Sequence, residues 1–136
     1  IGKIMDIQER RRFLATERNP DIKLDYVITI TGHMATHNDV ERSVVSLRYV
    51  PDKMILQPAT FGHYLDALGT LDWAALEEAA AAVLNDVNNE IIARWVQVGI
   101  SAPDQVHPGI DSHEVLLEDR QPNWDNAGLL SRLKRH

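Results

Sequence analysis

The sequence predicts an α+β fold in which an antiparallel four-stranded sheet carries two helices on one face. Two alternating, β-branched segments come first, two segments of helical spacing follow, and two further alternating segments come last, which gives the order ββααββ. Short polar turns separate the members of each strand pair, and strands joined in this way pair antiparallel. The chain has 136 residues, of which 44% are hydrophobic, so we expect residues 1–136 to form a single domain.

The first predicted strand pair precedes the helices. Residues 24–31 alternate in polarity and are rich in β-branched side chains, which predicts the first strand. Residues 43–50 alternate in the same way and predict the second strand, which ends at Pro51. The segment 32–40 between them is polar and contains the turn signal Asn38-Asp39, so we expect a loop there.

Two helices are predicted in the middle of the chain. Pro58 suits the first turn of a helix, and Gly69 suits its end. Residues 73–87 predict the second helix, with Asp72 as its N-cap and Asn88-Asn89 as a segment that loosens its end. The residues expected on the apolar face of this helix are Trp73, Leu76, Ala80, Val83, Leu84 and Val87.

The second strand pair and the two ends complete the predicted domain. Residues 91–100 and 113–119 alternate and predict the third and fourth strands. Residues 1–20 are expected to contain a short N-terminal helix and 120–136 to form a C-terminal tail, which leaves 24–119 as the core. A four-stranded sheet has two open edges, and proteins commonly close such edges by pairing them with other copies. We therefore expect a homo-oligomer in which the sheets join into a barrel.

The composition limits the partners and the chemistry. A net charge of -6 argues against a nucleic-acid partner, because nucleic-acid-binding proteins carry basic patches, and the basic residues at 10–12 and 132–136 are expected to be solvated ends. No apolar run is long enough to span a membrane and no signal-peptide pattern is present, so we expect a cytoplasmic protein without a membrane partner. Cysteine is absent, which excludes thiolate chemistry.

Glu77 is the strongest candidate for a binding residue. On a helical wheel it lies at the edge of the apolar face, one turn from Trp73 and Ala80, whereas Glu78 points into water. A carboxylate with small neighbours can accept the paired N–H donors of a flat heterocycle, and the ring of Trp73 can stack on such a ligand. The alternative interpretation is a surface acid near a helix N-terminus, where the helix dipole favours carboxylates.

Histidine offers the remaining reactive chemistry. His113 and Glu114 open the fourth strand, where they are candidate catalytic groups, since a histidine can transfer protons near neutral pH. The alternative for His113 is a half-exposed residue at a strand end. His33 and His37 lie four residues apart, but this spacing aligns two imidazoles only on a helix, and here we expect a loop. We therefore expect no metal site.

Three short motifs resemble those of the tunnelling fold. They are Tyr-Val-Pro-Asp-Lys at 49–53, Tyr-Leu at 64–65 and Glu-Glu at 77–78. By eye the chain is most similar to the NADPH-dependent 7-cyano-7-deazaguanine reductases of queuosine biosynthesis. That family carries an Asp nine residues after its binding Glu, and Asp86 stands at this distance from Glu77. The resemblance implies that Glu77 holds a purine-like, deazaguanine-like or pterin-like ring at a subunit interface.

The chain departs from the reductases at the positions that carry out the chemistry. Their nucleophile is a cysteine at the end of the first strand, and residues 28–35 contain no thiol. Their cofactor-binding lysines correspond to Ala59 and Gly62, their arginine lies near Gly69, and Leu76 replaces the histidine before the Glu. A phosphate-bearing cofactor would lose its charge-assisted contacts at these positions. We expect no nitrile reduction, and no cofactor is indicated.

Three functions remain open after this comparison. The first is binding, with or without turnover, of a planar purine, 7-deazaguanine or pterin at a subunit interface. The second is a GTP-cyclohydrolase-like hydrolysis of a purine or pterin, which would need a metal ion to activate water. The third is a non-catalytic role in which the fold binds such a ring or acts as a scaffold.

Overall fold

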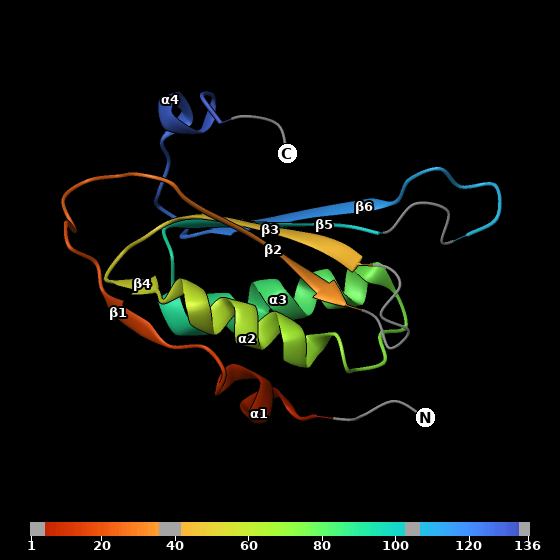
Figure 1. The fold of residues 1–136 in the computed structure, drawn as a ribbon. Coiled ribbons are helices and arrows are strands. Elements are labelled where there is room, and N and C mark those ends of the chain that lie inside the picture. The colour runs from red at the N-terminus through yellow and green to blue at the C-terminus, as the bar shows by residue number, and fades with distance from the viewer. Residues whose placement is uncertain (1–4, 36–41, 103–106, 134–136) are drawn as a thin grey trace.

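A four-stranded antiparallel sheet and the two helices that cover one of its faces form the centre of the computed structural model (Figure 1). The structure describes residues 5–35, 42–102 and 107–133. Across the sheet the strand order is β2-β3-β5-β6, and every neighbouring pair is antiparallel. These elements are β2 (Ile28–Ala35), β3 (Arg42–Val50), β5 (Trp95–Ser101), β6 (Glu114–Arg120), α2 (Pro58–Leu68) and α3 (Leu76–Ile91). The predicted order and the antiparallel pairing are confirmed.

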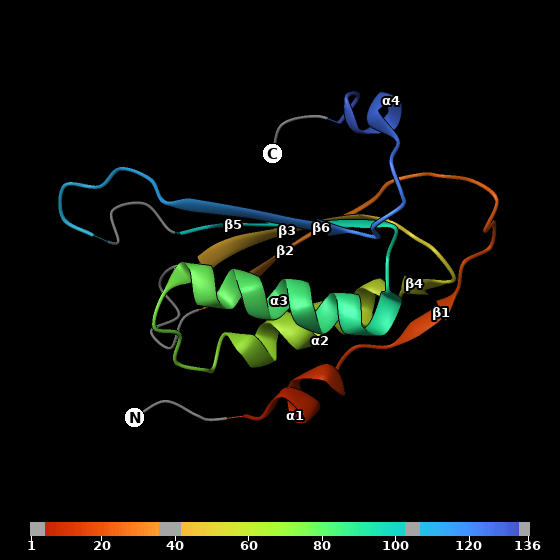
Figure 2. The same cartoon turned by 180° about the vertical axis from the view of Figure 1, so that it is seen from behind.

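Four shorter elements surround this centre. They are α1 (Ile7–Arg11), β1 (Thr16–Arg18), β4 (Met54–Leu56) and α4 (Ala127–Leu130). Helix α1 lies against α2 and α3 on the side away from the sheet, whereas α4 lies over the opposite face of the sheet (Figures 1 and 2). Strands β1 and β4 form a separate two-stranded ladder that the sequence analysis did not predict. Within the described residues, no helix has the length and apolarity needed to cross a bilayer.

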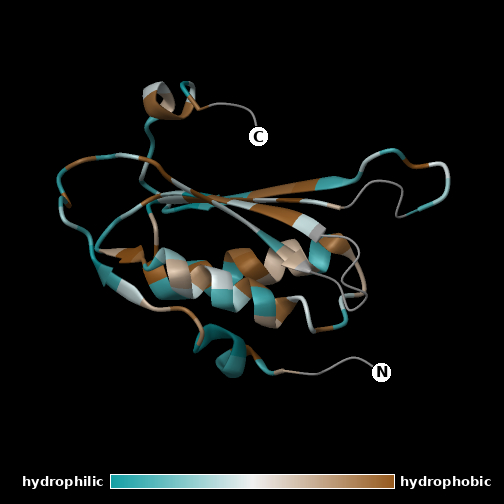
Figure 3. Ribbon diagram, in the orientation of Figure 1, coloured by the Kyte–Doolittle hydropathy of each residue, from teal (hydrophilic) through white to brown (hydrophobic). Residues whose placement is uncertain are grey.

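The core lies between the sheet and the two helices. Alternate residues of β3 and β5 point towards α2 and α3 and are almost completely buried. Figure 3 shows that apolar residues concentrate in these layers, whereas α1 is mostly hydrophilic. Tyr49 is neutral in this interior, since burial raises the pKa of its hydroxyl. The hydroxyl oxygen accepts a hydrogen bond from the amide of Leu56 at 2.8 Å. The inward-facing strand residues are Val45, Leu47, Tyr49, Val96, Val98 and Ile100.

The first strand is displaced from its predicted position. It was expected at 24–31 but spans Ile28–Ala35, so the segment predicted as a loop begins within β2. Pairing with β3 sets this register, because Ile28 lies opposite Tyr49 and Met34 lies opposite Ser43. The turn signal at Asn38-Asp39 lies outside the described residues.

The boundaries of α3 also differ from the prediction. The helix begins at Leu76 after an N-cap at Ala75, so Asp72 does not cap it. It continues through Asn88 to Ile91 instead of loosening there, and the Asn88 side chain accepts a hydrogen bond from the amide of Ala93 at 2.9 Å. The backbone then leaves the helix at Ile92, which has a positive φ of 44°.

The C-terminal tail is bound to its own chain. Asp25 accepts hydrogen bonds from Trp124 Nε1 at 3.2 Å and from Asn126 Nδ2 at 3.0 Å. The same carboxylate accepts a bond of 2.9 Å from Arg94, whose guanidinium also reaches the backbone oxygen of Leu24. These contacts place the tail and the loop before β2 together on the sheet face opposite α2 and α3.

Candidate functional site

Glu77 and His113 meet where α3 and β6 begin, at the same end of the sheet (Figure 2). Oε2 of Glu77 lies 3.3 Å from Nε2 of His113, which is hydrogen-bond distance. Residue 113 directly precedes β6, and Glu77 is in the first turn of α3. The structure therefore joins two of the four predicted site residues, although 36 positions separate them in the chain.

The Glu77 carboxylate is ionised and faces solvent. A hydrogen bond from its own backbone amide, followed by the contact with His113, lowers its pKa from the ordinary value. Its side chain is 62% exposed and that of His113 is 34% exposed. Glu77 is thus more exposed than the helical wheel predicts. The carboxylate can still accept two N–H donors from a ligand.

Glu78 is the natural reference for Glu77. It follows Glu77 in the same helical turn and is also exposed. One of its oxygens accepts a hydrogen bond of 3.4 Å from the amide of Ala74, so this side chain contributes to the start of the helix. The two neighbouring glutamates therefore differ in their partners, and only Glu77 contacts the histidine at the start of β6.

Glu114 does not join this pair. Val115 and Leu117 pack against the core on the helix side of the sheet. Successive residues of a strand point to opposite faces, so Glu114 points away from α3 and from Glu77. Within one copy of the chain, Glu114 therefore lies on the face of the sheet opposite α3.

Trp73 has a different place from the one predicted. It precedes the N-cap of α3, so the one-turn relation with Glu77, on which its stacking role depended, does not hold. Its indole N–H donates to the backbone oxygen of Leu68 at 3.0 Å, and the guanidinium carbon of Arg10 lies 6.0 Å from the ring centre. Trp73 is half-buried against the core and joins the end of α2 to α1.

The ion pairs of a buried carboxylate with two arginines are the main feature of the helical layer that the sequence does not predict. Asp86 is fully buried in α3 and accepts hydrogen bonds from Tyr64 at 2.6 Å, from Arg10 at 2.9 Å and 3.2 Å, and from Arg11 at 3.0 Å. The basic residues at 10–12 were expected to be a solvated end, but two of them bind this acid. The spacing from Glu77 pointed to Asp86, whereas no local signal pointed to its arginine partners.

No metal centre is formed by the part of the chain that the structure describes. It contains no group of three histidine, cysteine, aspartate or glutamate side chains that could hold an ion. His33 is exposed on β2, and His37 lies outside the described residues. The rings of His107 and His113 approach each other, with 6.4 Å between their centres, and Glu77 contacts His113, but these described residues do not form a metal-binding group.

The comparisons with known proteins show the fold. No protein-family model and no curated protein matches this sequence. Among solved structures, the chain is similar to the crystal structure of the archaeosine synthase QueF-Like in the apo form, with a TM-score of 0.53 and 20% sequence identity. The similarity covers 68% of this chain and 90% of that chain. The chain therefore shares the fold of that structure, which is consistent with the tunnelling fold predicted from the sequence.

Proposed function

We propose that this chain binds a planar purine, 7-deazaguanine or pterin ring through Glu77 at a contact between two copies of the chain. The observation that carries the proposal is the ionised, exposed Glu77 carboxylate with its His113 partner. A carboxylate that accepts two N–H donors recognises the amino and ring N–H groups that these heterocycles share. The fold of a QueF-like protein supports the same class of ligand.

The exposure of Glu77 is the reason for assigning the site to a subunit contact. Ligand sites usually bury most of the ligand, and a carboxylate that is 62% exposed in one copy does not provide such an enclosure. The sheet offers two edges for assembly, since β2 and β6 are its outer strands in the described residues. His113 directly precedes β6, so a second copy at that edge would cover the ring.

His113 is the group best placed to act on a bound ring. An imidazole in contact with the anchoring carboxylate can donate a hydrogen bond to the ligand or exchange a proton with it. Glu114 points away, so it would reach a ring only from a neighbouring copy. A hydrolytic reaction would in addition need a metal ion, and the described residues of one copy provide no ligand set for one.

A thermal-shift screen against guanine, 7-cyano-7-deazaguanine, GTP and neopterin tests the proposal. A ligand that binds only the folded state raises the unfolding midpoint, and we expect at least one of the four to do so. With that ligand, Glu77→Gln should weaken binding by about 10- to 100-fold in calorimetry, because one acceptor oxygen becomes a donor.

Glu78→Gln is the matched control. It makes the same chemical change one residue away, so binding should persist while the helix start loses a little stability. Equal loss of binding in both variants, or no midpoint shift with any of the four compounds, would contradict the assignment of Glu77.

A further inference from the structure

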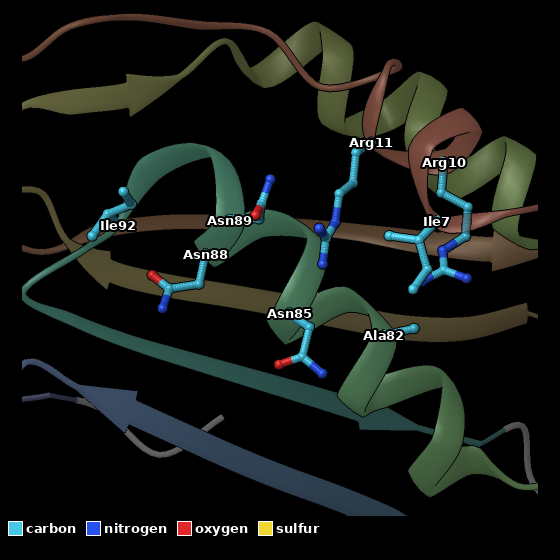
Figure 4. A pocket seen from close by; sticks show the side chains of 8 residues that line it. All are labelled: Ile7, Arg10, Arg11, Ala82, Asn85, Asn88, Asn89 and Ile92. Atoms are coloured by element: carbon cyan, nitrogen blue, oxygen red, sulfur yellow. The ribbon is translucent and has the colours of Figure 1, made fainter.

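A second site lies along the other half of α3. A hollow of about 460 Å³ opens between α1 and the segment from Ala82 to Ile92 (Figure 4). This volume is within the range of small-molecule sites in proteins. Glu77 does not line the hollow, so the two sites use different parts of the same helix.

The hollow has an excess of positive charge. Two guanidinium groups, those of Arg10 and Arg11, line it, and both bind Asp86. The hydrogen bond to Asp86 raises the pKa of Arg10, so it stays charged. None of the side chains that line the hollow is acidic, although Asp86 and Asp6 both act on Arg10 through their charges.

Arg11 has N–H donors that no described residue accepts. Its Nε binds Asp86 at 3.0 Å, and its two terminal nitrogens have no hydrogen-bond partner among the described residues. The Arg11 side chain is 22% exposed, so these donors are only partly hydrated. A partly buried guanidinium with unused N–H groups favours an anionic acceptor.

Amide groups extend the row of donors. Asn88 accepts a bond from the Ala93 amide through its oxygen, which leaves its NH₂ group to face away from that bond. Asn85 lies one turn earlier in α3 and has no side-chain partner in the described part of the chain. Figure 4 shows the side chains of Arg11, Asn85 and Asn88 around the hollow.

We infer that the hollow between α1 and α3 binds a small molecule through an oxyanion group, either a phosphate or a carboxylate. Arg11 is the charged contact and the side-chain amides of Asn85 and Asn88 are the neutral donors. Both cations, Arg10 and Arg11, belong to α1, and their ion pairs with Asp86 hold them over α3.

Isothermal titration calorimetry with pyrophosphate and with citrate, at low ionic strength, tests the inference on the whole chain. We expect saturable binding of at least one of them, and the tighter ligand shows whether phosphate or carboxylate is preferred. Arg11→Gln should weaken it by about tenfold or more, since a charge-assisted contact is lost. Asn85→Asp should weaken it similarly, because a side chain of the same shape then repels the anion.

Two matched variants separate the site from the overall charge of the protein. Arg12→Gln removes the same charge from the exposed neighbour of Arg11, and Asn123→Asp adds the same charge in the exposed turn after β6. Both should leave the affinity unchanged. Absence of binding for both probes at millimolar concentration, or affinity that Asn85→Asp does not reduce, would overturn the inference, even if Arg11→Gln proved too unstable to assay.

Discussion

The hydroxyl oxygen of Tyr64 lies 2.6 Å from Oδ2 of Asp86, and this bond joins α2 to α3 inside the helical layer. Burial, followed by the neighbouring Asp86 charge, raises the pKa of Tyr64 far above its ordinary value, so the hydroxyl stays protonated and donates. Arg10 and Arg11 bind the same carboxylate from α1. One buried acid therefore connects three helices.

Asp86→Asn should be one of the most destabilising single substitutions in this chain. The neutral amide leaves two partly buried guanidinium groups without their anion, and breaking a buried ion pair in this way costs about 3–5 kcal/mol. Tyr64→Phe removes only one hydrogen bond and should cost about 1–3 kcal/mol. Urea denaturation of both variants measures the difference. Equal losses would mean that the arginine contacts contribute little to stability.

Two glycines should respond in opposite ways to alanine. A Cβ at Gly32 in β2 would lie 2.7 Å from Cδ1 of Leu65, which is buried in α2, so Gly32→Ala should cost about 1–3 kcal/mol through overpacking. A Cβ at Gly62 meets nothing within 4 Å, so Gly62→Ala should stabilise α2 by about 0.5–1 kcal/mol. Thermal unfolding distinguishes the two. A stable Gly32→Ala protein would show that α2 does not approach β2 so closely.

The attachment of the C-terminal tail should depend on pH. Burial favours the neutral form of Asp25, but hydrogen bonds from Asn126, Arg94 and Trp124 outweigh it and lower its pKa from the ordinary 3.8. A carboxylate whose pKa is lower in the folded than in the unfolded chain stabilises the fold fully at a pH above its unfolded-state pKa. This stabilisation is lost as the pH falls through the folded-state pKa.

Asp25→Asn therefore provides the measurement. The difference in free energy of unfolding between the unmodified chain and this variant should be largest near neutral pH and should shrink as the pH falls below 3.8. Asp66→Asn, on the exposed side of α2, is the control, and its difference should stay small throughout. A pH-independent difference for Asp25→Asn would show that its charge does not hold the tail.

The assembly state of the chain can be measured directly. The outer strands β2 and β6 each present an open edge in the described residues, so we expect a homo-oligomer. Light scattering at micromolar concentration should give a multiple of 15.4 kDa. A mass of one chain over the whole concentration range would rule out both the predicted barrel and a ligand site shared between copies.

Nitrile reduction should be absent. The sequence contains no cysteine to attack the nitrile, and Ala59 and Gly62 on the exposed side of α2 replace the expected cofactor cations. Purified protein mixed with 7-cyano-7-deazaguanine and NADPH should show no loss of absorbance from NADPH. Sustained, enzyme-dependent consumption would show that a side chain other than cysteine attacks the nitrile.

Local patterns were sufficient to predict the parts of this fold that local physics determines. The alternation of β3 and the spacing of α2 match the structure closely, because burial on one face imposes a period on the sequence. The start of β2 was misplaced because pairing with β3, rather than its own composition, sets its limits. Helix α3 also extends past Asn88, and composition does not reveal the bond that the Asn88 side chain accepts from Ala93.

In the candidate site too, local patterns predicted individual residues but not the contacts between distant ones. Glu77 was found from its place on a helix and from a family resemblance, and His113 from its chemistry. Their contact joins residues 36 positions apart, and the contact between Arg10 and Asp86 joins residues 76 apart. Such pairs follow from the three-dimensional arrangement of elements, so no local pattern predicted them.

The place of β3 beside β5 at the centre of the sheet has a kinetic consequence. Val50 pairs with Trp95, and this contact closes the loop 51–94, which contains both long helices. The outer pairs β2–β3 and β5–β6 join segments that are near neighbours in the chain, so their loop-closure entropy is smaller. The two hairpins should therefore form early, and docking of one hairpin on the other through β3 and β5 should limit the rate of folding.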